Sequence, residues 1–318
     1  RPRRDHRDEA NENRRTVTAI TILDGGMGKE LRRIGAPFRQ PEWSSLALIE
    51  APERVVEAHH NFIEAGAGVI TTNNYAVVPY HHSAAFFAER GRELTALAGR
   101  LARAAADSAP TWVRVAGSLP PLFGSYEPER FDRARAAPIY RDIAEALDPF
   151  VDIWLAETLS TIGEMTTIAD AIAPVRRDRP LWVSFSVPDV WTDDRIALRS
   201  GESIEDVVAT VAAQELPVDA LLINCSIPEQ TGPALGALRR ARDAAGLDLA
   251  LGAYANAFPT QREHDYQANE VIFERRSELT TDRYAEFVAD WVADGATLVG
   301  GCCDMYPEHI AALAQRFG

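Results

Sequence analysis

Residues 296–303 read ATLVGGCC, a short apolar, β-rich run that ends in two glycines and two cysteines. Seven earlier runs have the same character: TAITILD (18–24), AGVITTNN (67–74), TWVRVAGS (111–118), VDIWLAET (151–158), PLWVSFSV (180–187), VDALLINC (218–225) and LDLALGAYA (247–255). Amphipathic stretches of helical period lie between them, such as PERVVEAHHNFIEAG (52–66), GRELTALAGRLARAAADSA (91–109), SIEDVVATVAAQE (203–215) and DRYAEFVADWVADG (282–295). Buried strands that alternate with crossover helices predict a parallel sheet. Eight such units in about 300 residues predict an α/β chain that forms a (β/α)8 TIM barrel.

A doubly wound open sheet is the alternative fold for the same alternation of strands and helices. That fold commonly carries GxGxxG after its first strand, whereas this chain has DGGMGKE, in which the glycines are spaced differently. The first 15 residues, RPRRDHRDEANENRR, are polar and without periodicity, so we expect a disordered arm or a remnant of expression there. The remainder, 16–318, is predicted to be one barrel domain.

Composition limits the classes of partner. The 318 residues are 46% hydrophobic and 25% charged, as is usual for a globular protein, and the formal charge of -14 argues against binding to nucleic acid or an acidic membrane. No run reaches the roughly 18 uncharged apolar residues of a membrane span. Three cysteines cannot all pair, so reduced thiols in a cytoplasm are expected. We therefore expect small-molecule substrates; the sequence does not indicate the oligomeric state.

Nearly every predicted strand ends in a residue that could take part in chemistry. In a barrel of this type the carboxyl ends of all strands surround one mouth, where active sites lie. The residues at these ends are Asp24, Asn73, Asn74, Ser118, Glu157, Ser184, Ser186, Asn224, Cys225, Tyr254, Asn256, Cys302 and Cys303.

The three cysteines of the chain, Cys225, Cys302 and Cys303, all lie at such ends. Three sulfurs that face one space indicate a soft metal, above all Zn²⁺, and three ligands leave one position open, as a catalytic zinc requires. Neighbouring side chains of a strand point to opposite faces, so we expect Gly300 and Gly301 to provide the backbone freedom that turns both sulfurs inward. The alternatives are buried structural thiols beside an unrelated third, or a vicinal disulfide with a redox role.

The chain resembles a known family, the zinc- and homocysteine-dependent S-methyltransferases, which include bacterial and plant homocysteine methyltransferases and the betaine-dependent enzyme. The resemblance runs from about Ile22 to His309. LDGGMGKEL is similar to the opening DGGMGTEL, AGAGVITTNNY to AGADxITTNTY, and AET to the segment with the fourth-strand glutamate. INCS and GGCC are similar to the two segments that supply the zinc cysteines, and this pair of motifs is the most specific part of the match.

The resemblance implies roles for individual residues. Cys225, Cys302 and Cys303 would bind zinc, and the thiol of homocysteine would occupy the open position. Asp24 and Glu157 would hold the ammonium group of the amino acid. Its carboxylate would meet backbone amides of the turn from Gly25 through Gly26 and Met27 to Gly28. Asn224 is a further candidate for substrate binding, although an asparagine there could equally satisfy loop backbone.

The candidates for the donor pocket are Asn73, Tyr75, Tyr254 and Asp304. The family's GGCCGT is GGCCDM here, and Lys29, the only lysine, stands where threonine is common; YPNAG appears as YANAF. Asp304 is expected to favour a cationic donor or the substrate ammonium unless Lys29 or an arginine neutralises it, or else to cap the helix that begins near Pro307. The long segment 256–280 is expected to cover the donor.

The expected activity is methyl transfer from an onium donor to homocysteine, which gives methionine. S-Methylmethionine is the favoured donor, S-adenosylmethionine is possible, and betaine stays open. The alternatives are transfer to another thiol or a selenol, a zinc hydrolase on the same barrel, and a non-catalytic protein that binds zinc or thiols. Three cysteine ligands argue against the hydrolase, because such enzymes use mainly histidine and carboxylate ligands.

Overall fold

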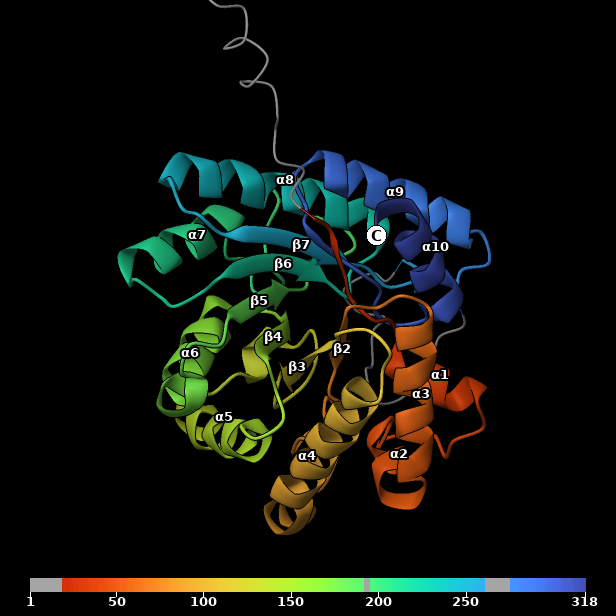
Figure 1. The fold of residues 1–318 in the computed structure, drawn as a ribbon. Coiled ribbons are helices and arrows are strands. Elements are labelled where there is room, and N and C mark those ends of the chain that lie inside the picture. The colour runs from red at the N-terminus through yellow and green to blue at the C-terminus, as the bar shows by residue number, and fades with distance from the viewer. Residues whose placement is uncertain (1–18, 192–194, 261–274) are drawn as a thin grey trace, which may run out of the picture.

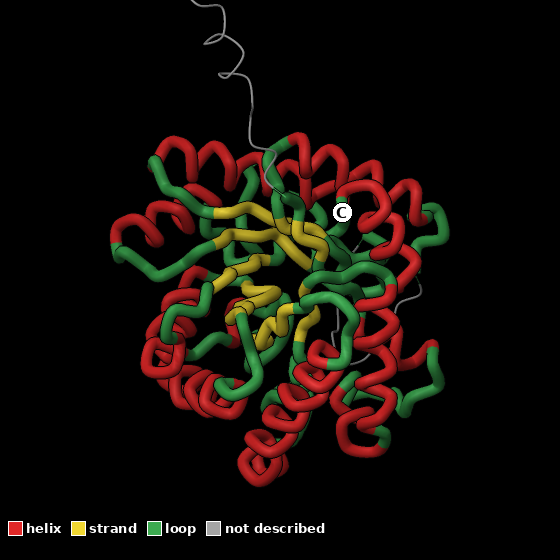
Figure 2. Tube along the Cα trace, in the orientation of Figure 1, coloured by secondary structure: helices red, strands yellow, loops and turns green. Residues whose placement is uncertain are grey.

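The predicted strands form one parallel sheet that closes into a barrel (Figures 1 and 2). The computed structural model describes residues 19–191, 195–260 and 275–318, so the predicted arm 1–15 lies outside the described residues. Neighbours follow the order β1-β8-β7-β6-β5-β4-β3-β2, and a parallel bridge from Leu23 to Val69 closes the ring between the first two strands. The strands are β1 (Thr21–Ile22), β2 (Val69–Thr71), β3 (Arg114–Leu119), β4 (Ile153–Leu159), β5 (Leu181–Phe185), β6 (Ala220–Asn224), β7 (Ala250–Tyr254) and β8 (Leu298–Val299).

The helices surround this barrel, as Figure 2 shows. They are α1 (Met27–Arg33), α2 (Ser45–Glu50), α3 (Pro52–Glu64), α4 (Ala84–Asp107), α5 (Arg133–Leu147), α6 (Ile162–Arg176), α7 (Ile204–Ala213), α8 (Pro228–Ala245), α9 (Thr281–Ala293) and α10 (Pro307–Phe317), with a 3₁₀ turn, η1, at Pro128–Arg130. The C-terminal α10 contacts both α9 and α3, so it joins the two ends of the helical ring. The α/β barrel predicted from the alternating pattern is confirmed.

Two apolar layers hold the barrel together. One fills its interior with side chains that include Leu155, Trp182 and Leu222. The other lies between strands and helices and includes Phe62, Trp154 and Trp291, each at most 1% exposed. Because successive strand side chains point to opposite faces, a strand buried on both sides must be apolar almost throughout, as these runs are.

Capping residues account for helix boundaries that apolar spacing alone misplaces. Helix α4 begins at Ala84, seven residues before the predicted stretch, because the Ser83 hydroxyl accepts a hydrogen bond from the Phe86 amide at its first turn. Helix α10 begins at Pro307 as predicted. None of the helices in the described ranges has the length and apolar character that a bilayer crossing requires.

Candidate active site and metal centre

The three cysteine sulfurs meet at the carboxyl ends of β6 and β8, as the strand pattern predicts. The Sγ atoms of Cys225 and Cys303 lie 3.6 Å apart, and all three Sγ atoms lie within 4.8 Å of one another. Zn–S bonds of about 2.3 Å in a tetrahedron place sulfurs about 3.8 Å apart. Within the described ranges no histidine or carboxylate joins this group. The donor set and its spacing therefore fit a zinc ion with three protein ligands.

The sulfurs interact strongly with one another. Hydrogen bonds from the thiols of Cys302 and Cys303 hold the pKa of Cys225 well below its usual range, and the same contacts with Cys225 raise the pKa of the other two. A cation that replaces the shared protons would be held by all three sulfurs.

The backbone that carries Cys302 and Cys303 differs from the prediction in one respect. Strand β8 ends at Val299, so the two cysteines lie in a turn beyond it. The hydroxyl of Tyr284, on α9, donates to Gly300 O at 2.6 Å and accepts from the Ala255 amide at 3.1 Å. This hydroxyl lies between the ends of β7 and β8 and separates backbone groups that a continuing ladder would pair directly.

Gly300 and Gly301 contribute close packing rather than unusual dihedral angles. A Cβ on Gly300 would lie 2.5 Å from Leu23 Cβ, and one on Gly301 2.4 Å from Met305 Cβ. Within and beside the cysteine segments, left-handed backbone occurs instead at Cys225, with φ 46°, and at Asp304, with φ 62°. The expectation that glycine freedom turns the sulfurs inward is therefore wrong in its detail.

A tyrosine from a neighbouring loop supports the unusual backbone of Cys225. The Tyr126 hydroxyl donates to Cys225 O at 3.0 Å, and the Arg199 guanidinium lies 4.0 Å from the centre of the Tyr126 ring. The Ser186 hydroxyl, which accepts from Arg199 Nε at 2.9 Å, also reaches the Cys225 carbonyl at 3.4 Å. The loops after β3 and β5 thus both hold the first zinc-ligand candidate.

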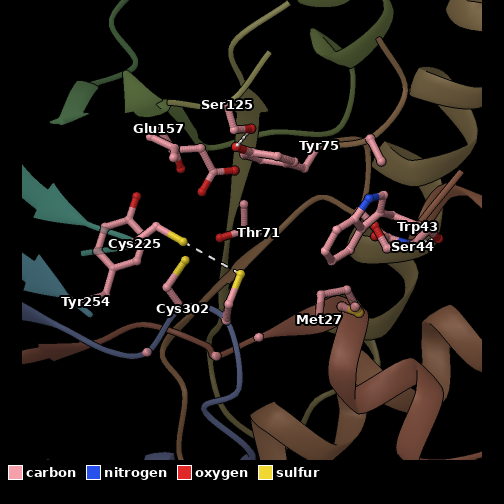
Figure 3. Close-up of a pocket in the computed structure, with 18 of the residues that line it drawn as sticks. Met27, Trp43, Ser44, Thr71, Tyr75, Ser125, Glu157, Cys225, Tyr254 and Cys302 are labelled. Atoms are coloured by element: carbon pink, nitrogen blue, oxygen red, sulfur yellow. Dashed lines mark hydrogen bonds between the residues drawn. The ribbon is translucent and has the colours of Figure 1, made fainter. Parts of the chain in front are cut away.

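The sulfurs face a pocket at the barrel mouth (Figure 3). Apolar and aromatic side chains form most of the wall, and a few polar groups converge on the cysteines, as in most ligand sites. The lining includes Asp24, Gly25, Gly26, Met27, Trp43, Ser44, Thr71, Asn73, Tyr75, His81, Ser125, Tyr126, Glu157, Tyr254, Phe258 and the three cysteines.

Asp24 and Glu157 both line this pocket and are almost fully buried, with 6% and 8% exposure. Asp24 accepts hydrogen bonds from the Thr71 amide at 2.7 Å and the Thr71 hydroxyl at 3.1 Å. Glu157 accepts one from the Ser118 hydroxyl at 2.5 Å. Burial raises the pKa of Asp24 to about 7 and that of Glu157 to about 8, with the nearby Asp24 adding to the second effect. No ion pair to either carboxyl is found among the described residues, and two such carboxyls suit a ligand that brings a cation.

The turn from Gly25 to Met27 lies directly against the cysteine turn. The Gly26 amide donates to Met305 O at 2.8 Å. A Cβ on Gly25 would lie 2.4 Å from Met305 O, and one on Gly26 would lie 2.7 Å from Cys302 O. These glycines are required because two backbone segments touch there.

Asn224 is placed away from the pocket wall, in contrast to its assignment as a substrate ligand. Its Oδ1 accepts from the Thr158 amide at 2.9 Å and the Ser184 hydroxyl at 2.7 Å, and its Nδ2 donates to Thr158 Oγ1 at 2.8 Å. Thr158 has φ 61°, which is rare for a β-branched residue, and the register of β4 against β5 shifts there. Asn224 therefore stabilises the irregularity that directs Glu157.

Three of the four donor-pocket candidates do line the pocket. Asn73 is fixed by its Nδ2, which donates to Ser44 O at 3.1 Å, and the Tyr75 hydroxyl lies 2.7 Å from Ser125 Oγ. Tyr254 lies on the wall beside the sulfurs (Figure 3). Residues 261–274 of the long segment expected to cover the donor lie outside the described residues.

For Asp304 the structure shows the exception that the sequence left open, and the alternative role as a helix cap is wrong. Its carboxylate does not line the pocket but lies 3.0 Å from Lys29 Nζ, so Lys29 neutralises it. It is not the cap of α10 either, because the residue before that helix is Tyr306, whose amide donates to His309 Nδ1 at 3.1 Å.

Sequence reasoning missed several pocket residues that come from loops. Trp43, His81, Ser125 and Tyr126 line the pocket, yet none lies at the end of a strand. Thr71 and Thr72 also line the pocket and lie at the end of β2, directly before Asn73. Among the missed residues, strand ends were therefore a usable signal for these two threonines.

Comparison with known proteins agrees with this site. The profile of the family described as "Homocysteine S-methyltransferase" matches residues 21–317. The chain is 33% identical to the homocysteine S-methyltransferase of Escherichia coli K12, over 93% of this chain and 95% of that protein. It is 26% identical to a selenocysteine methyltransferase of Astragalus bisulcatus, over 92% and 90% of the two chains. The crystal structure of the metallated form of the homocysteine methyltransferase MmuM from Escherichia coli superposes with a TM-score of 0.72 and 28% identity, covering 98% and 99% of the two chains. On fold, site and sequence, the chain belongs to the homocysteine S-methyltransferase family.

Proposed function

We propose that the protein transfers a methyl group from a small onium compound, S-methylmethionine in the first place, to homocysteine, with zinc as cofactor. The observation that carries the proposal is the set of three cysteine sulfurs within 4.8 Å of one another, open to a pocket that also holds two buried carboxyls. Zinc held by Cys225, Cys302 and Cys303 would lower the pKa of the homocysteine thiol and keep it as a nucleophilic thiolate at neutral pH.

The buried carboxyls supply the site for the amino acid. In this proposal Asp24 and Glu157 ionise when the substrate ammonium enters, and the charge-assisted hydrogen bonds offset their desolvation. The Gly26 amide is committed to Met305 O. The substrate carboxylate is therefore assigned to the amides of Met27 and Gly28, in the first turn of α1, where no intrahelical acceptor exists.

Aromatic side chains supply a surface for the methyl donor. Trp43, Tyr75 and Phe258 line the same pocket as the sulfurs, and an onium cation is attracted to aromatic faces, most strongly when water is excluded. The substrate sulfur attacks the methyl carbon in line, the bond from that carbon to the onium sulfur breaks, and a neutral thioether leaves. Once the acceptor is a thiolate the transfer itself needs no general base, so the remaining work of these residues is orientation.

Transfer to a selenol is the second candidate, because a selenocysteine methyltransferase is among the relatives. Its acceptor side chain is one carbon shorter than that of homocysteine. The distance between the sulfurs and the Asp24–Glu157 pair would therefore favour one acceptor over the other.

A double-label assay tests the proposal. Zinc-loaded protein is incubated with homocysteine carrying a ¹³C skeleton and with a donor carrying a deuterated methyl group, and methionine is analysed by mass spectrometry. S-Methylmethionine, S-adenosylmethionine and betaine are compared as donors, and selenocysteine as a competing acceptor. Methionine that carries both labels is expected with S-methylmethionine; its absence with all donors would contradict the proposed activity.

A further inference from the structure

The only lysine of the chain forms a buried ion pair next to the cysteines. Lys29 Nζ lies 3.0 Å from Asp304 Oδ1, and the two side chains are 8% and 1% exposed. The chain has 33 basic residues of which 32 are arginine, so lysine is used at this position alone. Lys29 and Asp304 are also two of the positions at which the sequence departs from the pattern of the family that it resembles. In the structure the side chains at these two positions contact each other.

This contact involves costs that a surface ion pair does not. Both charges lose most of their hydration there, so removal of one would leave the other buried without this contact. Asp304 also has a left-handed backbone, with φ 62°, which aspartate adopts more readily than most residues but less readily than glycine. Among the described residues, its Oδ1 receives one further and longer contact, from the Tyr306 hydroxyl at 3.4 Å. Both the desolvation and the left-handed backbone occur directly after Cys303, which suggests that the ion pair has a role at the metal site.

The pair joins two segments that already touch through their backbones. Asp24 O accepts from the Gly301 amide at 2.9 Å, and Met305 O accepts from the Gly26 amide at 2.8 Å. These bonds flank the cysteines on both sides, and the cysteines themselves bond to the segment after β7, where the Cys302 amide donates to Ala255 O at 2.9 Å and Cys303 O accepts from the Ala257 amide at 3.0 Å. The Lys29–Asp304 contact adds a side-chain link directly beside Cys303, from the first turn of α1.

We infer that the Lys29–Asp304 ion pair is a positioning device that holds the Cys302–Cys303 turn in its metal-binding conformation and so sets the affinity for zinc. The inference rests on the zinc site of the proposed function. It assigns neither residue a contact with substrate. Partners that orient metal ligands change metal affinity by roughly 10- to 100-fold when they are removed.

Zinc affinity in matched variants tests the inference. Asp304→Asn and Lys29→Met each remove one charge, and the double variant removes both; zinc dissociation constants are measured by competition with a chromophoric chelator. Each single variant is expected to bind zinc at least about tenfold more weakly. The double variant is expected to lose less than the product of the two single losses, because its second substitution removes no further ion pair. Dissociation constants within twofold of wild type in all three would overturn the inference.

An ion pair at the opposite end of the barrel provides the control. Arg179 and Asp148, 16% and 18% exposed, pair where α5 and α6 lead into β4 and β5. Arg179→Met should lower the melting temperature and leave zinc affinity unchanged. If the Lys29 and Asp304 variants behave like this control, their pair is merely structural.

A measurement on the wild-type protein keeps the inference testable if a variant fails to fold. Because Lys29 is the only lysine, an amine-reactive reagent can modify just this side chain and the N-terminal amine, and peptide mapping separates the two. Coupling between two equilibria is reciprocal, so zinc should lower the population in which Lys29 is released from Asp304. Modification that occurs from this population should therefore slow by at least about fivefold. Equal rates with and without zinc would overturn the inference. Wild-type protein that binds no zinc would instead contradict the proposed function itself.

Discussion

Replacement of Glu157 by glutamine should separate substrate binding from stability. Glu157 is 8% exposed, and its Oε1 accepts a single hydrogen bond, from Ser118, among the contacts described above. A charge-assisted hydrogen bond to the substrate ammonium contributes about 1.5–3 kcal/mol. Its loss in Glu157→Gln should weaken homocysteine binding by roughly 10- to 150-fold, at about 1.4 kcal/mol per factor of ten.

The same substitution should not lower the stability of the substrate-free protein. Because burial raises the pKa of Glu157 from 4.5 to about 8, the folded protein binds an extra proton between these values. The free energy of unfolding contributed by this group therefore falls as pH rises through that window, and the full cost of the buried carboxylate is present above pH 8. Glutamine removes this titration, so substrate-free Glu157→Gln should melt at the same or a higher temperature than wild type at pH 8.5.

Glu164 offers a matched control on the following helix. It is 4% exposed, burial raises its pKa to about 7, and its Oε2 accepts from the Ser160 and Thr161 amides, but it does not line the pocket. Calorimetric titration with homocysteine should show a large loss of affinity in Glu157→Gln and none in Glu164→Gln. Equal affinity of wild type and Glu157→Gln would refute the assignment of the ammonium to Glu157.

Three further outcomes are expected. Removing zinc with a chelator, or replacing any one of the three cysteines by alanine, should empty the metal site but leave far-UV circular dichroism unchanged, because the barrel core forms without metal; cooperative unfolding on chelation would contradict this. Asn224→Ala leaves the buried Thr158 amide without its acceptor, which should lower the free energy of unfolding by about 1–3 kcal/mol and so lower the melting temperature. It should also weaken homocysteine binding, because Glu157 loses its support; unchanged binding would oppose this role. His59 is fully buried, and burial lowers its pKa to about 3, so the stability that depends on its neutral form is lost as pH falls from about 6.5 to 3. His59→Leu should remove this loss, which amounts to roughly 3 kcal/mol at pH 4. An unchanged dependence of unfolding on pH would count against this expectation.

The strand pattern was sufficient for the fold and for the groups at strand ends. Period and apolar content identify the eight strands, and barrel topology then brings Cys225 beside Cys302 and Cys303, nearly eighty residues later in the chain. Asp24 and Glu157 follow from the same argument. These features depend on backbone geometry that every barrel of this type shares.

Features that depend on contacts between loops could not be predicted in this way. The Tyr284 hydroxyl between Gly300 O and the Ala255 amide interrupts the ladder just before the cysteines, and a helical tyrosine carries no signal for that contact. The direction of the Asp304 carboxylate depends on Lys29, which lies 275 positions earlier in the sequence. Trp43 and Tyr126 come from connections without periodicity, so nothing in their spacing indicates that they reach the pocket.

X-ray absorption at the zinc edge tests the central claim most directly, since it reports the number of sulfur atoms bound to the metal. Zinc-loaded protein without substrate should show three sulfurs at about 2.3 Å and one lighter ligand. On addition of homocysteine the sulfur number should rise to four. Fewer than three sulfurs in the substrate-free protein, or a sulfur number that homocysteine does not change, would contradict the account.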